Sequence, residues 1–314
     1  SILVRLGDPA LAGDLAATQV VTAPAGALTC NIIGYTLENP TDGDTILAST
    51  TNVQNGNPMT ASPTAYIPIG GWIDGDQTEA RWQYTFRVSS TLSNLRVFCS
   101  NAPVQDTTFR TRINLANGAQ SVVVNATGAF EDTTNTDAVV AGDEVNFSLS
   151  SVGGGAGSYS VCQLKSVATG RQLVCSNEVA TVYSSDVYNV PEGHQTLGDS
   201  ATESVTQKTA RSGFTASNMF VFVQTHGLSS GVDIFLRLNG ANSALTVNIP
   251  QSTTGVFEDT TNTVSVVAAD LYNYFIDHGG GAGTMAATII GFQAAPTDTV
   301  VDLIGGKLNI LLRM

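Results

Sequence analysis

One seven-residue string, Phe-Glu-Asp-Thr-Thr-Asn-Thr, occurs twice in this chain, at residues 130–136 and again at residues 257–263. Weaker matches flank both copies. The offset between matched residues drifts from 124, for Ser93 and Ser217, to 127, for Phe130 and Phe257. Such drift is expected when one fold is present twice and its loops gain or lose single residues. The sequence therefore predicts a tandem duplication and two similar domains.

The composition restricts the class of protein. The 314 residues are enough for two domains that each bury a core. Charged residues are only 12% of the chain, yet no apolar run approaches the roughly 20 residues that a membrane-spanning helix needs. The net charge of -13 opposes contact with a phosphate backbone. We therefore expect a soluble protein that binds neither nucleic acid nor a membrane.

Apolar residues alternate with a period of two in many short segments, which is the pattern of half-buried strands. Helical spacing is not sustained over three turns, so we expect few and short helices. The strands predicted in the first copy are 95–99, 109–114, 121–125, 138–140, 144–149 and 159–166. Those in the second copy are 217–224, 233–238, 245–249, 264–267, 271–276 and 285–292. Asn117-Gly118 and Asn239-Gly240 predict tight hairpin turns.

These segments favour an antiparallel β-sandwich in each copy, with extensions at both ends. The expected divisions are an N-terminal arm at 1–27, a first sandwich at 28–170, a second sandwich at 171–295 and a C-terminal tail at 296–314. The region up to about Gly75 has no clear counterpart ahead of the second copy, so we expect it to hold additional strands or an arm.

Both ends of the chain are apolar. The residues concerned are Ile2, Leu3 and Val4 at one end and Ile310, Leu311 and Leu312 at the other. Such segments must be covered, either by their own domain or by a neighbouring subunit, so they are candidate assembly segments.

Each copy also contains the same series of local features. Each copy begins with an arginine-containing strand, an Asn-Gly or Asn-Ser turn and a valine strand. These are followed by Phe-x-Asp-Thr-x-Asn, which we predict to be a loop, and then by Val-x-Ala-Gly-Asp and a glycine-rich turn. This series, over roughly residues 85 to 295, resembles jelly-roll modules of bacteriophage virion proteins. In the first copy the resemblance is carried by Arg112, Asn117, Gly118, Phe130, Asp132, Thr133, Asn135, Ala141, Gly142 and Asp143. In the second it is carried by Arg237, Asn239, Gly240, Phe257, Asp259, Thr260, Asn262, Ala268 and Asp270.

The resemblance implies an all-β fold of two tandem jelly-roll-like antiparallel β-sandwich domains. The second copy departs from the pattern at Ala269, where the first copy has Gly142. This departure raises the question whether the turn requires a positive φ, which glycine adopts most readily.

The repeated acidic segments could be metal sites, because Glu131-Asp132 and Glu258-Asp259 are adjacent carboxylates followed by hydroxyl and amide side chains. However, neighbours on an extended chain point in opposite directions, and the ligand spacing of a calcium loop is absent. We therefore favour Asx turns, in which Asp132 and Asn135 cap the local backbone. The full set of repeat-signature residues with an expected structural role is Phe130, Asp132, Asn135, Asp143, Phe257, Asp259, Asn262 and Asp270.

Catalysis finds little support in the sequence. His194, His226 and His278 are the only histidines, and they form no His-x-x-x-His pair. A Ser-His-Asp triad built from distant positions stays open as an alternative. We expect no enzymatic activity, no cofactor and no metal ion.

Cysteines and tryptophans have both structural and functional interpretations. Cys30, Cys99, Cys162 and Cys175 lack metal-site spacing and are predicted to be free buried thiols rather than disulfides. Trp72 and Trp82 are predicted to lie in the core rather than on a sugar-binding platform.

Three classes of function remain open. The favoured one is a virion structural protein on the outer capsid surface, either a decoration (cement) protein that bridges capsid subunits or a double jelly-roll capsid subunit. Its expected partners are other capsid proteins and copies of itself, as a trimer, because trimers are common among the virion jelly rolls that the chain resembles. The alternatives are a spike or adhesin module that binds host glycans, and a jelly-roll hydrolase or lectin-like accessory domain.

Overall fold

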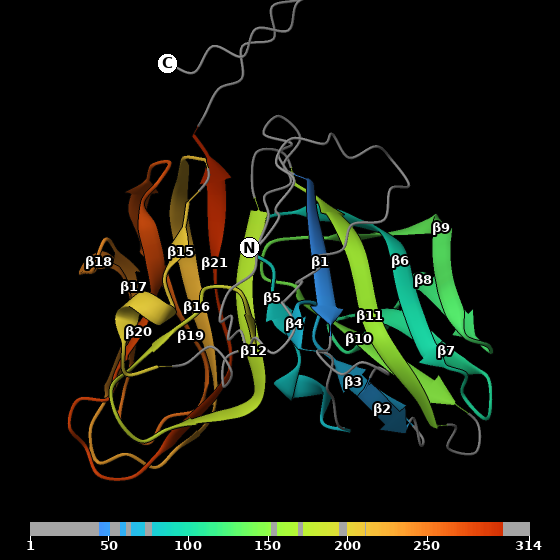
Figure 1. Ribbon diagram of the computed structural model, residues 1–314, viewed down its shortest axis with the longest axis horizontal. Helices are drawn as coiled ribbons and strands as arrows, with labels where there is room; N and C mark the ends of the chain where they lie inside the picture. The colour runs from blue at the N-terminus through green and yellow to red at the C-terminus, as the bar shows by residue number, and fades with distance from the viewer. Residues whose placement is uncertain are drawn as a thin grey trace, which may run out of the picture.

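The computed structural model describes residues 44–50, 57–60, 64–72, 77–151, 156–168, 172–194, 200–210 and 212–297. These residues form strands and short 3-10 helices, and the strands make four sheets that pair into two sandwiches (Figure 1). The all-β class predicted from the alternating pattern is therefore confirmed. The candidate assembly segments Ile2–Val4 and Ile310–Leu312 lie outside the described residues, as does the predicted N-terminal arm.

The first sandwich runs from β1 to β11. One sheet has the order β4-β1-β11-β6-β9, with β2 also paired to β11, and the other has the order β3-β10-β7-β8, with β5 also paired to β10. The elements are β1 (Asp44–Thr50), β2 (Asn57–Thr60), β3 (Thr64–Ile67), β4 (Gly71–Trp72), η1 (Glu79–Arg81), β5 (Tyr84–Thr85), β6 (Ser90–Asn101), β7 (Thr107–Ile113), β8 (Ala116–Val124), β9 (Gly128–Val139), β10 (Glu144–Ser151) and β11 (Ala156–Val167).

The second sandwich runs from β12 to β21. Its sheets have the orders β14-β12-β21-β16-β19 and β13-β20-β17-β18, with β15 also paired to β20. The elements are β12 (Gln172–Tyr183), β13 (Val187–Asn189), β14 (Gly193–His194), η2 (Glu203–Val205), β15 (Lys208–Thr209), β16 (Phe214–His226), β17 (Val232–Leu238), β18 (Ala241–Ile249), β19 (Gly255–Val266), β20 (Leu271–Asp277) and β21 (Met285–Pro296).

Both sandwiches have jelly-roll topology. In the first, β7 and β8 form a hairpin in one sheet, β9 returns to the other sheet beside β6, β10 crosses back to lie beside β7, and β11 inserts between β1 and β6. The second sandwich repeats these crossings with β16 to β21. In each domain the four main strands of one sheet (β1, β11, β6 and β9 in the first domain) face four of the other (β3, β10, β7 and β8), and this connection is that of a jelly roll, as the resemblance implies.

The region before Gly75 does have a counterpart, contrary to the expectation from the sequence. β1, β3 and β4 occupy the same places in the first sandwich as β12, β13 and β14 in the second, and β4 and β14 both pair in parallel with the strand beside them. The sequences of these equivalent strands share only a few identical residues. Many residue types can fill the alternating buried and exposed positions of a strand, so the likeness was hard to see in the sequence. The offset also changes between β1 and β3, where the first domain adds β2.

Each domain buries its core between its two sheets. Strands β7 and β17 show the same alternation of buried and partly exposed residues, and so do β8 and β18. Cys99 and Val223 are both fully buried at equivalent places, so the cysteine acts as a small apolar core residue, as predicted. Cys99 and Cys162 are free thiols. Cys30 and the side chain of Cys175 lie outside the description.

All twelve predicted strands lie within observed strands or differ from them by a residue at one end, but two details were wrong. The repeated heptapeptide is not a loop. It lies within β9 and β19, where the pairing with β6 and β16 is interrupted by a bulge after Asp132 and Asp259. Asn239-Gly240 does form the β17–β18 turn, but Asn117-Gly118 lies inside β8, and Asn114-Leu115 forms the matching β7–β8 turn.

Gly118 is required for space rather than for a turn. A Cβ atom at this position would lie 2.3 Å from Oγ1 of Thr111 and 2.7 Å from Oδ2 of Asp137. This close approach explains why a turn-like dipeptide occurs inside a strand, near the start of β8.

Candidate functional site

The signature aspartate of the first domain is held by five hydrogen bonds. Oδ1 of Asp132 accepts from the backbone N–H of Thr134 at 3.1 Å, from the Thr134 hydroxyl at 3.1 Å and from the backbone N–H of Asn135 at 3.0 Å. Oδ2 accepts from the Asn135 amide and from the backbone N–H of Ser121, both at 2.9 Å. The first set is the local backbone capping that the sequence predicts for Asp132 in an Asx turn, whereas Asn135, also predicted to cap the backbone, donates its side-chain amide to the Asp132 carboxylate instead.

Asp259 repeats this arrangement in the second domain. Its Oδ1 accepts from Thr261 and from the backbone N–H of Asn262, and its Oδ2 accepts from the Asn262 amide at 3.0 Å and the backbone N–H of Thr246 at 3.1 Å. Burial raises the pKa of both aspartates, but the hydrogen bonds to the carboxylate outweigh it and bring each pKa below its ordinary value. Both groups are therefore carboxylates at neutral pH.

The bonds from Ser121 and Thr246 connect different sheets. Ser121 lies on β8 and Asp132 on β9, which are the edge strands of the two facing sheets of the first domain. Thr246 on β18 and Asp259 on β19 make the same connection in the second domain. The signature aspartate therefore closes one open side of each sandwich.

This environment does not suit a cation. The lone pairs of Asp132 and Asp259 are already directed at N–H and O–H donors, whose positive ends would repel a metal ion. In the described part of the chain, no group of three or more His, Cys, Asp or Glu side chains is placed to hold a metal. The carboxylate repeats are built for internal hydrogen bonding.

Asp143 and Asp270 connect neighbouring turns. Asp143 accepts from the Asn114 amide at 2.7 Å and from the backbone N–H of Val140 at 2.8 Å, and Asp270 accepts from Asn239 and Val267 at 2.8 Å each. The bonds from Asn239 and Val267 lower the pKa of Asp270. Each aspartate thus fixes the β9–β10 or β19–β20 turn to the hairpin turn beside it.

The glycine that the second copy lacks stands at a position of positive φ in both domains. Gly142 has φ of 97° and Ala269 has φ of 77°. The turn therefore keeps its left-handed conformation even where alanine replaces glycine, at a cost in strain that glycine avoids.

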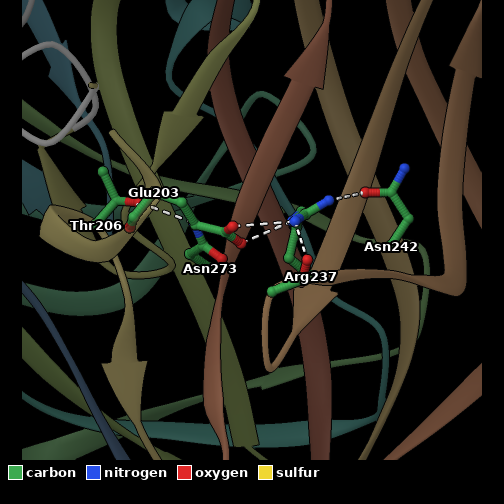
Figure 2. Close-up of polar contacts among 6 residues, drawn as sticks. Glu203, Thr206, Arg237, Asn242 and Asn273 are labelled. Atoms are coloured by element: carbon green, nitrogen blue, oxygen red, sulfur yellow. Dashed lines mark hydrogen bonds and ion pairs between the residues drawn. The ribbon is translucent and has the colours of Figure 1, made fainter. Parts of the chain in front are cut away.

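A further pair of residues connects each 3-10 helix to the adjacent sheet; its arginine belongs to the repeat pattern, but its glutamate was not identified from the sequence. In the second domain, Arg237 donates to Oε1 and Oε2 of Glu203 at 2.7 and 3.0 Å, to Asn242 at 2.5 Å, and to the Gly240 carbonyl (Figure 2). The side chains of Arg237 and Glu203 are 13% and 19% exposed, so the ion pair is largely shielded from water.

The first domain contains the same network. Arg112 donates to both carboxylate oxygens of Glu79 at 2.8 and 2.9 Å and to Asn117 at 2.5 Å. Hydrogen bonding to Glu79 raises the pKa of Arg112, and Glu203 does the same for Arg237. A signal for the glutamates was present, because Thr78-Glu79 and Thr202-Glu203 are 124 residues apart.

The remaining candidate residues have structural positions. Phe130 and Phe257 pack at equivalent places, but each is only partly buried against the core of its domain. Trp82 is fully buried, as predicted, and the side chain of Trp72 lies outside the description.

Two of the three histidines lie at one end of the second domain. Nδ1 of His226 accepts from the backbone N–H of Ser252 at 2.9 Å, and the Nε2 atoms of His226 and His278 are buried without a hydrogen-bond partner in the described structure. Burial lowers the pKa of His226, and His278 lowers it further by charge repulsion. The side chain of His194 is outside the description.

The two domains are joined through a buried arginine. Nη1 of Arg87, whose side chain is 7% exposed, contacts Oε1 of Glu258 at 2.7 Å, and its guanidinium lies 4.5 Å from the centre of the Phe220 ring. Phe220 and Ile289 of the second domain belong to the core cluster of the first. The amide oxygen of Gln224, oriented toward Arg81, accepts from that arginine at 3.0 and 3.1 Å. This contact fixes one jelly roll against the other.

Comparisons with known proteins add no family to this description. No protein-family model matches the chain, and no curated protein matches it. Among the described residues, no helix has the length and apolar character needed to cross a membrane.

Proposed function

We propose that this chain is a structural protein of a bacteriophage virion, which decorates the outer surface of the capsid and holds neighbouring capsid subunits together. The observation that carries the proposal is the fixed pairing of two jelly rolls through Arg87, Glu258 and Phe220. A chain built in this way presents two related surfaces at a constant distance and angle. Such a block can bridge two neighbouring subunits of a shell.

Bridging needs contact area rather than a cleft. A specific protein contact buries on the order of 1,200 to 2,000 Å². When one domain is bound, the other is held close to the adjacent subunit, which raises its effective concentration and strengthens attachment without any new chemistry. The net charge of -13 then keeps coated particles apart.

The repeated polar residues support a structural role. Asp132 and Asp259 close the sandwiches, and Arg112 and Arg237 hold the 3-10 helices, so the residues that recur in both domains are engaged in holding the fold. The proposal includes no turnover and no cofactor.

A second candidate is a subunit of the shell itself, and the repeated strand order in both domains favours it, because two equivalent domains can take quasi-equivalent places in a lattice. The decisive experiment is to prepare particles that lack this protein. Intact shells with reduced resistance to heat or osmotic shock support decoration. Failure to form any shell supports the subunit role, and normal stability with loss of host attachment supports an adhesin.

Adding purified protein back to stripped particles tests the bridging mechanism. The wild-type chain is expected to restore heat resistance, whereas Arg87→Ala, which loosens the contact between the domains, is expected to restore less at the same occupancy. Arg110→Ala, which removes a partly exposed arginine of β7, serves as the matched control and should restore resistance fully. Equal restoration by both variants contradicts the bridging mechanism.

A further inference from the structure

The contact between the two domains has two parts. Strands β1 and β4 of the first domain lie against β12 and β14 of the second, which are their equivalents, and the rest of the contact is not symmetrical. The first domain contributes the corner formed by η1, β5 and the following Arg87, and the second contributes the outer face of its sheet, through Phe220 on β16, Glu258 on β19 and Ile289 on β21. Because the two domains share one fold, each also carries the half of this contact that it does not use. Head-to-tail contacts of this kind can be repeated from one copy to the next.

The unused sheet face lies on the first domain. Phe98 on β6 occupies the place of Phe222, since the two pair with Ala129 and Val256 at equivalent registers. By the same criterion, Glu131 occupies the place of Glu258. In the strand register, Glu131 pairs with Arg96 on β6, and Glu258 pairs with Phe220 on β16.

Phe98 and Glu131 differ in their contacts from Phe222 and Glu258, as expected if the sheet face of the first domain has no domain packed on it within the chain. Phe222 packs against the core of the first domain, whereas Phe98 is 39% exposed. Glu258 pairs with the buried Arg87, whereas Glu131 is exposed, with one hydrogen bond of 3.3 Å from Asn94. Figure 1 shows β6 and β9 on the side of the first domain that is remote from the second.

The unused corner lies on the second domain. η2 and β15 follow one another as η1 and β5 do, and both 3-10 helices are tied to their sheets by the same arginine–glutamate pair. Val205, the last residue of η2, occupies the place that Arg81 has in η1. Arg81 donates to Gln224 of the other domain, whereas the side chain of Val205 is apolar and 38% exposed. An exposed apolar side chain at an equivalent contact position fits a surface that becomes covered.

We propose that copies of this chain associate head to tail, so that the η2–β15 corner of one copy packs on the β6–β9 face of the first domain of the next copy. The contact repeats between chains the one that joins the two domains within a chain. It rests on the proposed structural function, for which it supplies the partner surface. Arg96 and Ala129 replace Phe220 and Val256 on this face, so the contact between chains is more polar and weaker than the one within a chain.

The experiment uses the intact chain and measures its mass by sedimentation and light scattering over a wide range of concentration. The wild type is expected to form closed rings or open chains. Phe98→Glu and Glu131→Arg are each expected to weaken association at least tenfold. Val123→Glu places the same charge at a residue that is 49% exposed on β8 of the opposite sheet, and it should associate like the wild type. Far-ultraviolet circular dichroism and thermal unfolding check that each variant is folded.

Three results would overturn the proposal. One is a wild-type monomer at all concentrations. Another is association that Phe98→Glu and Glu131→Arg leave unchanged. The third is a two-fold symmetrical dimer, because a head-to-tail contact is not of that type. The virion role is tested separately, since monomeric Phe98→Glu can still be added to stripped particles and their heat resistance measured.

Discussion

The turn between β7 and β8 offers a sharp test of how backbone strain is distributed between the two domains. Asn114 and Leu115 form this turn with φ of 50° and 67°, and Asn239 and Gly240 form the equivalent turn with φ of 51° and 82°. Both are two-residue hairpin turns in which both central residues are left-handed. Leucine is poorly suited to this conformation, and glycine adopts it freely. We predict that Leu115→Gly stabilises the first domain.

The magnitude follows from two opposing effects. A left-handed conformation costs a residue with a side chain about 1–2 kcal/mol, which the substitution recovers. Glycine makes the unfolded chain more flexible, which costs about 0.4–1 kcal/mol. Leu115 is 58% exposed, so little burial is lost, and its carbonyl, which accepts from Arg112, is retained. The net gain is about 0.5–1 kcal/mol.

The reverse substitution is the matched control. Gly240→Leu places a side chain at φ of 82°, where the nearest atom to a new Cβ is Oε2 of Glu203 at 4.0 Å. Space is therefore available, and the loss of about 0.5–1 kcal/mol reflects backbone strain alone.

The tryptophans make the assay specific to one domain. Both of them, Trp72 and Trp82, precede the second domain in the sequence, and Trp82 is fully buried in the first. Tryptophan fluorescence during urea unfolding therefore reports on the first domain, while circular dichroism reports on both. Leu115→Gly should raise the fluorescence midpoint by roughly 0.3–0.5 M. An unchanged or lower midpoint would refute the assignment of strain to Leu115.

Three further perturbations have expected outcomes. Arg112→Lys loses the two-pronged contact with Glu79 and should destabilise the first domain by about 1–3 kcal/mol in urea unfolding. Asp132→Asn turns amide hydrogens toward N–H donors and should cost about 2–3 kcal/mol at pH 7. Because the folded pKa of Asp132 is depressed, its contribution is present above pH of about 4 and falls as pH drops toward the folded value, so the cost should shrink in acid. The folded pKa of His226 is also depressed, so the unfolded state takes up the proton first and stability should fall below pH of about 6.5.

Each of these outcomes has its own control. Arg237→Lys should act on the second domain, leaving the tryptophan transition unchanged; a shift there would mean that the domains unfold as one unit. An Asp132→Asn cost that is equal at pH 7 and pH 3 would contradict the role of the charged carboxylate. His226→Asn keeps an acceptor for the Ser252 N–H and should remove the loss between pH 7.5 and 5.5. A loss of the same size in that variant would assign it to another group.

The sequence predicted the strands because alternation of apolar residues directly reflects which side chains face the core. It also predicted the role of Asp132, because the hydrogen bonds of an Asx turn join residues two or three positions apart. Patterns within a few residues of the sequence therefore identified the strands and the Asx turn, because the alternation and the hydrogen bonds both involve residues close in the chain.

Long-range contacts were not accessible in the same way. Arg112 and Glu79 are 33 residues apart, and Arg87 and Glu258 belong to different domains, so no spacing rule connects them. The heptapeptide was taken for a loop because threonine and asparagine are common in loops, whereas the bulge that places it in β9 depends on pairing with β6. Asn117-Gly118 was misassigned because a glycine required for space looks the same in sequence as one required for a turn.

A comparison of one buried cluster between the domains shows what the fold requires. In the first domain, Asp137 accepts from Thr111 and from the backbone and side chain of Gln120, and all three side chains are buried. The equivalent places in the second domain hold Leu236, Leu245 and Val264, which are also buried.

A single exchange between these clusters would leave a polar group without a partner inside the protein, at a cost of about 1–3 kcal/mol. Replacing the whole set avoids that cost, because polar groups satisfy one another in one domain and apolar groups pack together in the other. The shared jelly roll therefore depends on the alternation of buried and exposed positions. It also depends on the turns, the aspartate hydrogen bonds and the arginine–glutamate pairs that recur in both domains. The chemistry of an individual core position is free to change, provided that its neighbours change with it.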